Sequence, residues 1–194
     1  TSASTKQDSR DDAERELARR LLGAEARLHA AAEARGAAAT VLRPTLVYGA
    51  GRDATLTRIA GMARRWGRFV LPTRADGLRQ PVHVDDLAAA ALAACEAQVA
   101  HGRAYDLSGG ERLPYREMVA RVLACVEPRP ALHALPMPVF LALLRLAQAR
   151  GIASGLGPGA VARMREDLVF DATPAARDFG YAPRGFHPTA GMFG

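Results

Sequence analysis

Apolar residues recur along this 194-residue chain at two spacings, which predict helices and buried strands in turn. Residues 8–35 predict a long amphipathic helix, because Leu17, Leu21 and Leu28 recur at helical spacing on one face. Residues 39–43 form a short apolar run between a glycine and a proline, which indicates a buried strand. Further helices are expected at 54–66, 86–98, 114–126, 137–150, 158–167 and 174–179, and further strands at 69–72, 80–84, 103–107 and 131–135.

Strands that alternate with helices favour an α/β fold with parallel strands. A dinucleotide-binding sheet opens with a strand, a glycine-rich loop and a helix, and nothing before residue 39 matches that unit. The chain therefore predicts the later part of such a sheet, with the first half absent.

Three motifs follow one another in a fixed order: L-R-P-T-L-V-Y-G-A-G at 42–51, R-Q-P-V-H-V-D-D-L-A at 79–88, and A-Y-D-L-S-G-G at 104–110. In the first motif a strand runs into Pro44, which cannot continue regular pairing, and then into a glycine-bracketed loop. Open α/β sheets bind ligands at this end of their strands. In this order and spacing, the motifs resemble the extended short-chain dehydrogenase/reductases, the NAD-dependent epimerase/dehydratase family.

The resemblance implies a partial Rossmann-like parallel sheet and a smaller α/β substrate-binding lobe. Residues 1–50 are expected to be the C-terminal part of the dinucleotide-binding domain, and residues 51–194 the substrate-binding lobe. Residues 79–110 are expected to return to the Rossmann sheet. Along the second motif, Asp85 is predicted to cap the helix over 86–98, and His83 is expected to be a hydrogen-bonded structural residue.

The resemblance also implies NAD or NADP as cofactor, and a nucleotide-sugar or a similar hydroxyl or carbonyl compound as substrate, with hydride transfer as the reaction. Pro44, Thr45 and Val47 would then lie beside the nicotinamide, and Tyr48 would help to shape the substrate site. Arg79 matches the arginine that grips the nucleotide-sugar phosphate in relatives, a task suited to a guanidinium fork. A surface salt bridge is the alternative role for Arg79.

Family members carry a catalytic tyrosine and a lysine four residues apart on the long helix. Here Ala24-Glu25 sets the register, and it places Leu17 and Leu21 at those two positions. Neither leucine transfers a proton, so both are expected to be buried against the sheet or to line the cleft beside Pro44 and Thr45, and turnover is in question. Thr1 is the candidate for the hydroxyl that holds the substrate oxygen. The alternative function is a non-catalytic protein that binds a dinucleotide as a sensor or scaffold.

Charge and composition bear on whether the chain binds nucleic acid, holds a disulfide or a metal, or contacts a membrane. The net charge is +6, but the basic residues are dispersed among acidic ones and few aromatics accompany them, which argues against nucleic-acid binding. Cys95 and Cys125 are expected to be free thiols, and no His, Cys or acidic cluster has metal-ligand spacing. No apolar run approaches the ~20 residues that span a bilayer, and the N-terminus is polar. The sequence thus favours a cytoplasmic protein without membrane contact, and it leaves a homodimer open.

Overall fold

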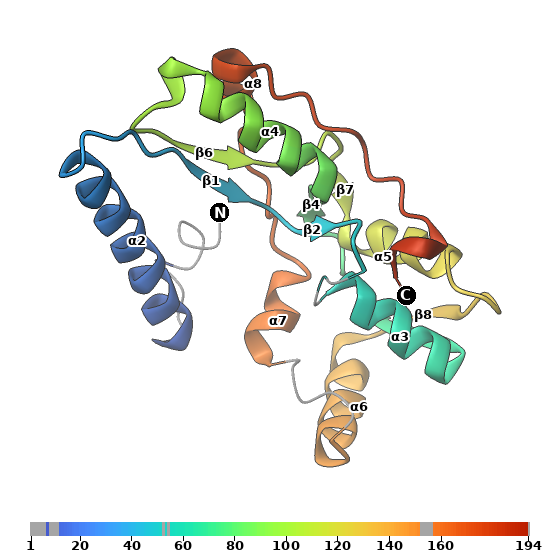
Figure 1. The fold of residues 1–194 in the computed structure, drawn as a ribbon. Coiled ribbons are helices and arrows are strands. Elements are labelled where there is room, and N and C mark those ends of the chain that lie inside the picture. Colours follow the sequence, from blue (N-terminus) through green and yellow to red (C-terminus); the bar gives the residue numbers. More distant parts are fainter. Residues whose placement is uncertain (1–6, 8–11, 52, 54, 152–156, 194) are drawn as a thin grey trace. The chain divides into compact units, whose positions relative to one another are not determined.

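The computed structural model describes residues 7, 12–51, 53, 55–151 and 157–193 (Figure 1). The chain divides into two compact units, and it passes between them more than once. Unit 1 comprises Thr1–Val47, Gln80–Glu111 and Phe170–Gly185. Unit 2 comprises Tyr48–Arg79, Arg112–Val169 and Phe186–Gly194.

Unit 1 is built on a parallel pair of strands. Strand β1 (Val41–Pro44) pairs with β6 (Ala104–Leu107), and Pro44 lies opposite Leu107 in the register. Its other elements are α2 (Asp12–Glu33), β5 (Val82–His83), α4 (Val84–Glu96), η1 (Gln98–Ala100) and α8 (Thr173–Phe179). Because two parallel neighbours need a crossover connection, helical chain separates β1 from β6 in the sequence.

The core of unit 1 brings together segments that lie far apart in the sequence. Val82, Leu107 and Ala175 are fully buried in one cluster. Tyr105 belongs to the same cluster and packs edge-on against Phe179, with ring centroids 5.0 Å apart. The small side chains of α4 let this helix approach the cluster closely, and Ala90 is buried there. The residues after 170 thus belong to the same core as the β1–β6 pair.

Unit 2 contains a second parallel pair, β3 (Arg68–Pro72) with β8 (Ala131–Leu135). It also contains an antiparallel pair, β4 (Leu78–Arg79) with β7 (Leu113–Pro114). The helices of unit 2 are α3 (Leu56–Trp66), α5 (Tyr115–Ala124), α6 (Met137–Ala149) and α7 (Pro158–Arg163), and the 3-10 helix η2 (Ala190–Met192) lies near the end of the chain. The short strand β2 (Val47–Tyr48) lies where the chain passes from unit 1 to unit 2. Helix α3 ends at Gly67, which adopts the left-handed conformation with φ of 62°.

Helices α3 and α5 bury matching apolar faces in the core of unit 2. Leu56, Ala60, Met118 and Val122 are all fully buried, at helical spacing on their two helices. Helix α6 contrasts with them, because Phe140 is its one buried residue although most of its side chains are apolar. Among the helices of the described residues, none is long and apolar enough to cross a bilayer.

Helix α2 corrects one expectation from the sequence. Leu17 and Leu21 were expected to be buried against the sheet or to line the cleft beside Pro44 and Thr45; they are 41% and 37% exposed, so they are not buried. The inward face of α2 is instead the row that contains Ala18, which is fully buried, and Glu25. Glu25 accepts a hydrogen bond of 3.0 Å from Arg43 Nε, and this ion pair ties α2 to β1. Since adjacent helical positions differ by about 100°, the neighbouring row of leucines is turned away.

The start of α4 is a second correction. Asp85 was expected to be the N-cap, but α4 begins at Val84 and His83 is the cap. The ring Nδ1 of His83 accepts the backbone N–H of Asp85 at 3.2 Å. Of the expected strand over 80–84, only Val82–His83 (β5) is a strand; β4 ends before it at Arg79, and Gln80 and Pro81 lie between the two.

Candidate functional site

The carboxyl end of the β1–β6 pair is the candidate site in unit 1, since parallel sheets bind ligands at this edge. Pro44 is the last residue of β1, and Thr45 follows it. The backbone N–H of Thr45 donates to the carbonyl of Leu107 at 3.0 Å, and its hydroxyl donates to the carbonyl of Gln80. Three segments therefore meet at this strand end.

Gln80 is the centre of a hydrogen-bond network at the same edge. Its side chain is buried, and Nε2 donates to Ser108 Oγ at 3.2 Å and to the carbonyl of Gly109 at 3.3 Å. Its Oε1 accepts the N–H of Phe170 at 2.9 Å. Ser108 Oγ donates to the carbonyl of Phe170 at 3.2 Å, and Tyr181 Oη donates to the carbonyl of Ser108 at 3.0 Å. The network orders the loops around the candidate site, and burial raises the pKa of Tyr181 well above its usual range.

The backbone at this edge approaches itself so closely that a glycine is required. A Cβ at Gly109 would lie 1.8 Å from the carbonyl oxygen of Pro81, and a Cβ at Gly110 would lie 2.2 Å from that of Pro183. Atoms at such distances cannot coexist, so the Ser-Gly-Gly motif has a packing explanation. It lets the loop after β6 touch the loop before β5.

The proposed nicotinamide contacts lie at this edge. Pro44, Thr45 and Val47 are each partly exposed. The Thr45 hydroxyl is bonded to the carbonyl of Gln80, and Val47 packs in part against the core of unit 1, so the partly exposed ring of Pro44 is an apolar surface at this edge. A flat nicotinamide ring suits such a surface.

A pyrophosphate site is not formed by the loop that follows β2. Asp53 occupies the N-terminus of α3: its Oδ1 accepts the N–H of Leu56 and, at 3.1 Å, the N–H of Thr57. Its Oδ2 accepts the Thr57 hydroxyl at 2.8 Å. A carboxylate thus takes the N–H groups that would bind a phosphate, and its charge would repel one. The loop at Gly49 and Gly51 is a capped turn and does not fit the pyrophosphate of a dinucleotide.

Arg79 lies in unit 2, where its guanidinium is buried, with the residue 7% exposed. Nη1 donates to the carbonyls of Leu78 at 2.7 Å and Glu166 at 2.8 Å, and Nη2 donates to the carbonyl of Arg163. The guanidinium carbon also lies 5.2 Å from the ring centroid of Tyr115. Burial lowers the pKa of Arg79. The geometry is that of a cation that joins β4 to the segment after α7.

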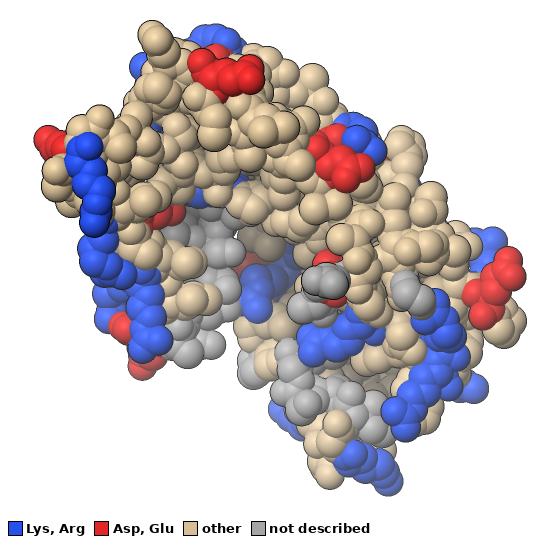
Figure 2. Space-filling model, viewed as in Figure 1, with Lys and Arg blue, Asp and Glu red and all other residues tan. Residues whose placement is uncertain are grey.

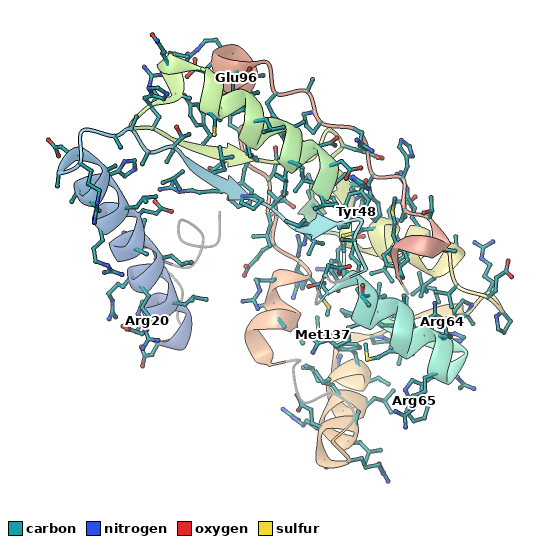
Figure 3. All side chains as sticks on the ribbon, viewed as in Figure 1. Arg20, Tyr48, Arg64, Arg65, Glu96 and Met137 are labelled. Atoms are coloured by element: carbon teal, nitrogen blue, oxygen red, sulfur yellow. The ribbon has the colours of Figure 1, made fainter. Side chains whose placement is uncertain are left out.

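Tyr48 and Thr1 are the two remaining candidate residues. Tyr48, which is labelled in Figure 3, is 1% exposed. It packs edge-on against Phe186, with 4.9 Å between the ring centroids. Thr1 lies outside the described residues, so the structure does not place it. Among the described residues, no group of histidine, cysteine and acidic side chains is arranged to hold a metal ion.

Sequence reasoning missed an ionic cluster on α8. The side chain of Asp178 is 4% exposed and accepts hydrogen bonds from Tyr105 Oη at 2.7 Å, Arg103 Nη1 at 3.0 Å and Arg177 Nε at 2.7 Å. The bond from Arg177, with that from Tyr105, lowers the pKa of Asp178 to about 2. No local pattern marks this cluster, because its members come from two segments about seventy residues apart. Gln80 was also missed, although it lies within the second motif.

Comparison with known proteins agrees with this architecture. Residues 18–108 match the NAD dependent epimerase/dehydratase family. Over this region, which is a little under half of the chain, the chain is similar to members of this family. Its fold is accordingly mixed α/β with parallel strands, as the sequence predicted, and it is Rossmann-like.

Individual family relatives are longer than this chain. A 2-alkyl-3-oxoalkanoate reductase from Stenotrophomonas maltophilia (strain K279a) is 32% identical over 176 residues, which are 83% of this chain and 51% of the relative. The UDP-glucose 4-epimerase of Thermotoga maritima, solved with UDP-glucose, is 20% identical with a TM-score of 0.57 over 84% of this chain and 46% of that one. RMD from Pseudomonas aeruginosa, solved with NADPH, is 16% identical with a TM-score of 0.56 over 84% and 48%. The chain thus spans about half the length of these relatives.

Proposed function

We propose that this chain forms part of an NAD(P)-dependent oxidoreductase that acts on a hydroxyl or carbonyl carbon by hydride transfer. The observation that carries the proposal is the ordered carboxyl end of the β1–β6 pair, where Pro44 and Val47 are partly exposed beside the Gln80 network. The bound nicotinamide would supply or accept the hydride. Unit 1 corresponds in this proposal to the later part of the dinucleotide-binding domain, and unit 2 to the substrate-binding lobe.

The residues of the chain have distinct tasks in this proposal. The half-buried Pro44 and Val47 would exclude water from one face of the nicotinamide ring, and Gln80 would hold their loop in place through Thr45. Thr1 is the proposed hydroxyl for the substrate oxygen. Tyr48 and Arg79 are the proposed substrate-binding residues of unit 2, where both are buried and brace the backbone around them.

The substrate class that we favour is a small carbonyl or hydroxyl compound over a nucleotide-sugar. Three N–H groups of the Arg79 guanidinium already bind backbone carbonyls, so a phosphate would have to compete with them. The name of the reductase that is 32% identical also points to a 3-oxo acid as substrate, and it supports this preference. A second candidate function, a non-catalytic dinucleotide sensor or scaffold, follows from the leucines at 17 and 21 in place of the family's tyrosine and lysine.

The experiment is a methyl NMR titration of the 194-residue chain with reduced nicotinamide mononucleotide, which carries the nicotinamide and lacks the adenylate half. We expect the methyl signals of Val47 and Thr45 to shift with one common dissociation constant. The methyl signals of Val99, which is 45% exposed in η1 of the same unit, serve as the control and should stay in place.

The titration gives a different result for the oxidoreductase, for the sensor or scaffold, and for a chain that does not bind nicotinamide. If the Val47 and Thr45 signals do not shift at the highest soluble concentration of the ligand, the proposed nicotinamide contact is wrong. If they shift, adding a 3-oxo acid or UDP-glucose to the complex should produce further shifts for the substrate class that binds. A nicotinamide response without a response to either compound favours the sensor or scaffold function.

A further inference from the structure

Helix α6 in unit 2 presents an apolar row to solvent. Val139, Leu143 and Leu146 are 47%, 47% and 51% exposed, and their spacing of four and three residues places them on one face of the helix. Phe140, about 100° around the helix from Val139, is buried, and α6 contacts β3. An isolated exposed leucine needs no explanation, but a row along a helix marks an interaction surface.

The charge around this row is of one sign. Between Glu127 and Glu166 the sequence holds five arginines and no aspartate or glutamate. Two of the arginines, Arg145 and Arg150, are exposed on α6 and directly after it. At the lower edge of Figure 2, around α6, arginines stand among uncharged atoms, and no acidic side chain is drawn there.

The same asymmetry holds for the two units as a whole. Unit 2 carries 15 of the chain's 26 basic residues and 6 of its 20 acidic ones, whereas unit 1 carries 11 and 14. The net charge of +6 is therefore a property of unit 2, which is strongly positive, while unit 1 is slightly negative. A cationic unit with an exposed apolar helix suits a partner that is both anionic and apolar.

We propose that α6 is an interfacial helix that binds unit 2 to an anionic lipid surface. Val139, Leu143 and Leu146 would enter the boundary between headgroups and acyl chains, while Arg145 and Arg150 would bind lipid phosphates. The helix has 13 residues, which suits binding in the plane of the interface and not a span. Lipid contact at α6 departs from the sequence expectation of no membrane contact, which rested on the lack of a spanning segment.

A second copy of the chain is a poorer occupant of this surface. Pairing α6 with α6 would bring the arginines of two copies together, and the segment from 128 to 165 has no acidic side chain to compensate them. Like charges across an interface oppose association. An acidic protein partner would satisfy the charge, but a continuous row of aliphatic side chains matches the depth of an acyl layer better than a polar protein surface.

The test is flotation of the 194-residue chain with vesicles of phosphatidylcholine alone, and with vesicles of equal parts phosphatidylcholine and phosphatidylglycerol. We expect binding to the anionic vesicles only. Binding should weaken when salt rises from about 0.1 M to about 1 M, since the Debye length falls from about 10 Å to about 3 Å.

Matched double variants assign the effect to α6. Leu143→Gln with Leu146→Gln should lower the vesicle partition by about tenfold or more, because two leucine side chains that would enter the lipid are replaced by polar ones. The control is Leu28→Gln with Leu92→Gln, which alters two exposed leucines of unit 1 and should leave partition unchanged. Both variants change exposed positions, and circular dichroism checks that each stays folded.

Four results would overturn the proposal. These are no binding to either vesicle, equal binding to the neutral vesicles, an equal loss of binding in the unit 1 control, and undiminished binding by the α6 variant. Sedimentation without lipid tests whether a second copy of the chain binds this surface. A concentration-dependent dimer that the α6 variant abolishes would assign the surface to a second copy. None of these outcomes depends on the nicotinamide titration.

Discussion

Arg79→Ala tests whether this arginine is chiefly a structural residue. The substitution removes three hydrogen bonds from a buried guanidinium to the backbone carbonyls of Leu78, Arg163 and Glu166. It also removes the contact of the cation with the ring of Tyr115. The sequence motif alone left Arg79 between phosphate binding and an ion pair, whereas this geometry predicts a loss of stability.

The expected loss is about 3 kcal/mol in the free energy of unfolding. A hydrogen bond to a charged group contributes about 1.5–3 kcal/mol, but the alanine variant no longer pays for burying a charge, so about 1 kcal/mol per bond remains. For a domain whose whole stability is about 5–15 kcal/mol, such a loss is large. Arg79→Lys should lose more than half as much, because an ammonium cannot reproduce a planar fork.

The assay is urea unfolding of the 194-residue chain, followed by circular dichroism. Arg116→Ala is the matched control, since Arg116 lies in the same unit, is 67% exposed, and pairs with Asp76 at 3.2 Å. Exposed ion pairs contribute about 0–1 kcal/mol, so this variant should unfold almost like the parent chain.

The reasoning is refuted if Arg79→Ala unfolds within about 0.5 kcal/mol of the parent, the scatter of an ordinary surface substitution. The guanidinium would then be dispensable to the fold. A weakened affinity for UDP-glucose in that stable variant would restore the phosphate-binding role that the motif implies.

Four further results are expected. The free energy of unfolding should fall as the pH drops from about 4 towards 2, because the ionised Asp178 carboxylate stabilises the fold and its pKa is lowered from 3.8 to about 2. Acid titration of Asp178→Asn should show a weaker decline in stability between those pH values. Gly109→Ala should destabilise the chain by more than about 3 kcal/mol, since its Cβ would overlap a carbonyl, whereas Gly61→Ala, with open space in α3, should stabilise it by about 0.5–1 kcal/mol; thermal melts of both decide. Leu17→Ala should cost less than about 1 kcal/mol against about 2–5 kcal/mol for the fully buried Leu56→Ala, and equal losses in urea would contradict the exposure of α2. Calorimetry of the 194-residue chain should find NADH and NADPH binding weaker than micromolar, because the loop after β2 does not cradle a pyrophosphate; micromolar affinity would contradict this.

The candidate site was predictable where residues adjacent in sequence also act together. The turn after β1, with Pro44 and Thr45, follows from proline chemistry and strand pattern, and the structure places it at the carboxyl end of a parallel pair. Gln80 was not predicted, because its partners Ser108 and Phe170 lie 28 and 90 residues away. A buried amide is recognised only when the carbonyls and N–H groups around it are known.

The sequence by itself determined the succession of helices and strands, the α/β class and the family motifs, because periodicity and turn chemistry act within a few residues. Tertiary structure alone decided which face of α2 turns inward, since the leucine row and the row of Ala18 and Glu25 both suit a helix and the pair with Arg43 selects one. It also decided that Arg79 binds carbonyls and that the leucines of α6 stay exposed. Local pattern shows that a side chain is apolar or charged, and only the packed chain supplies its partner.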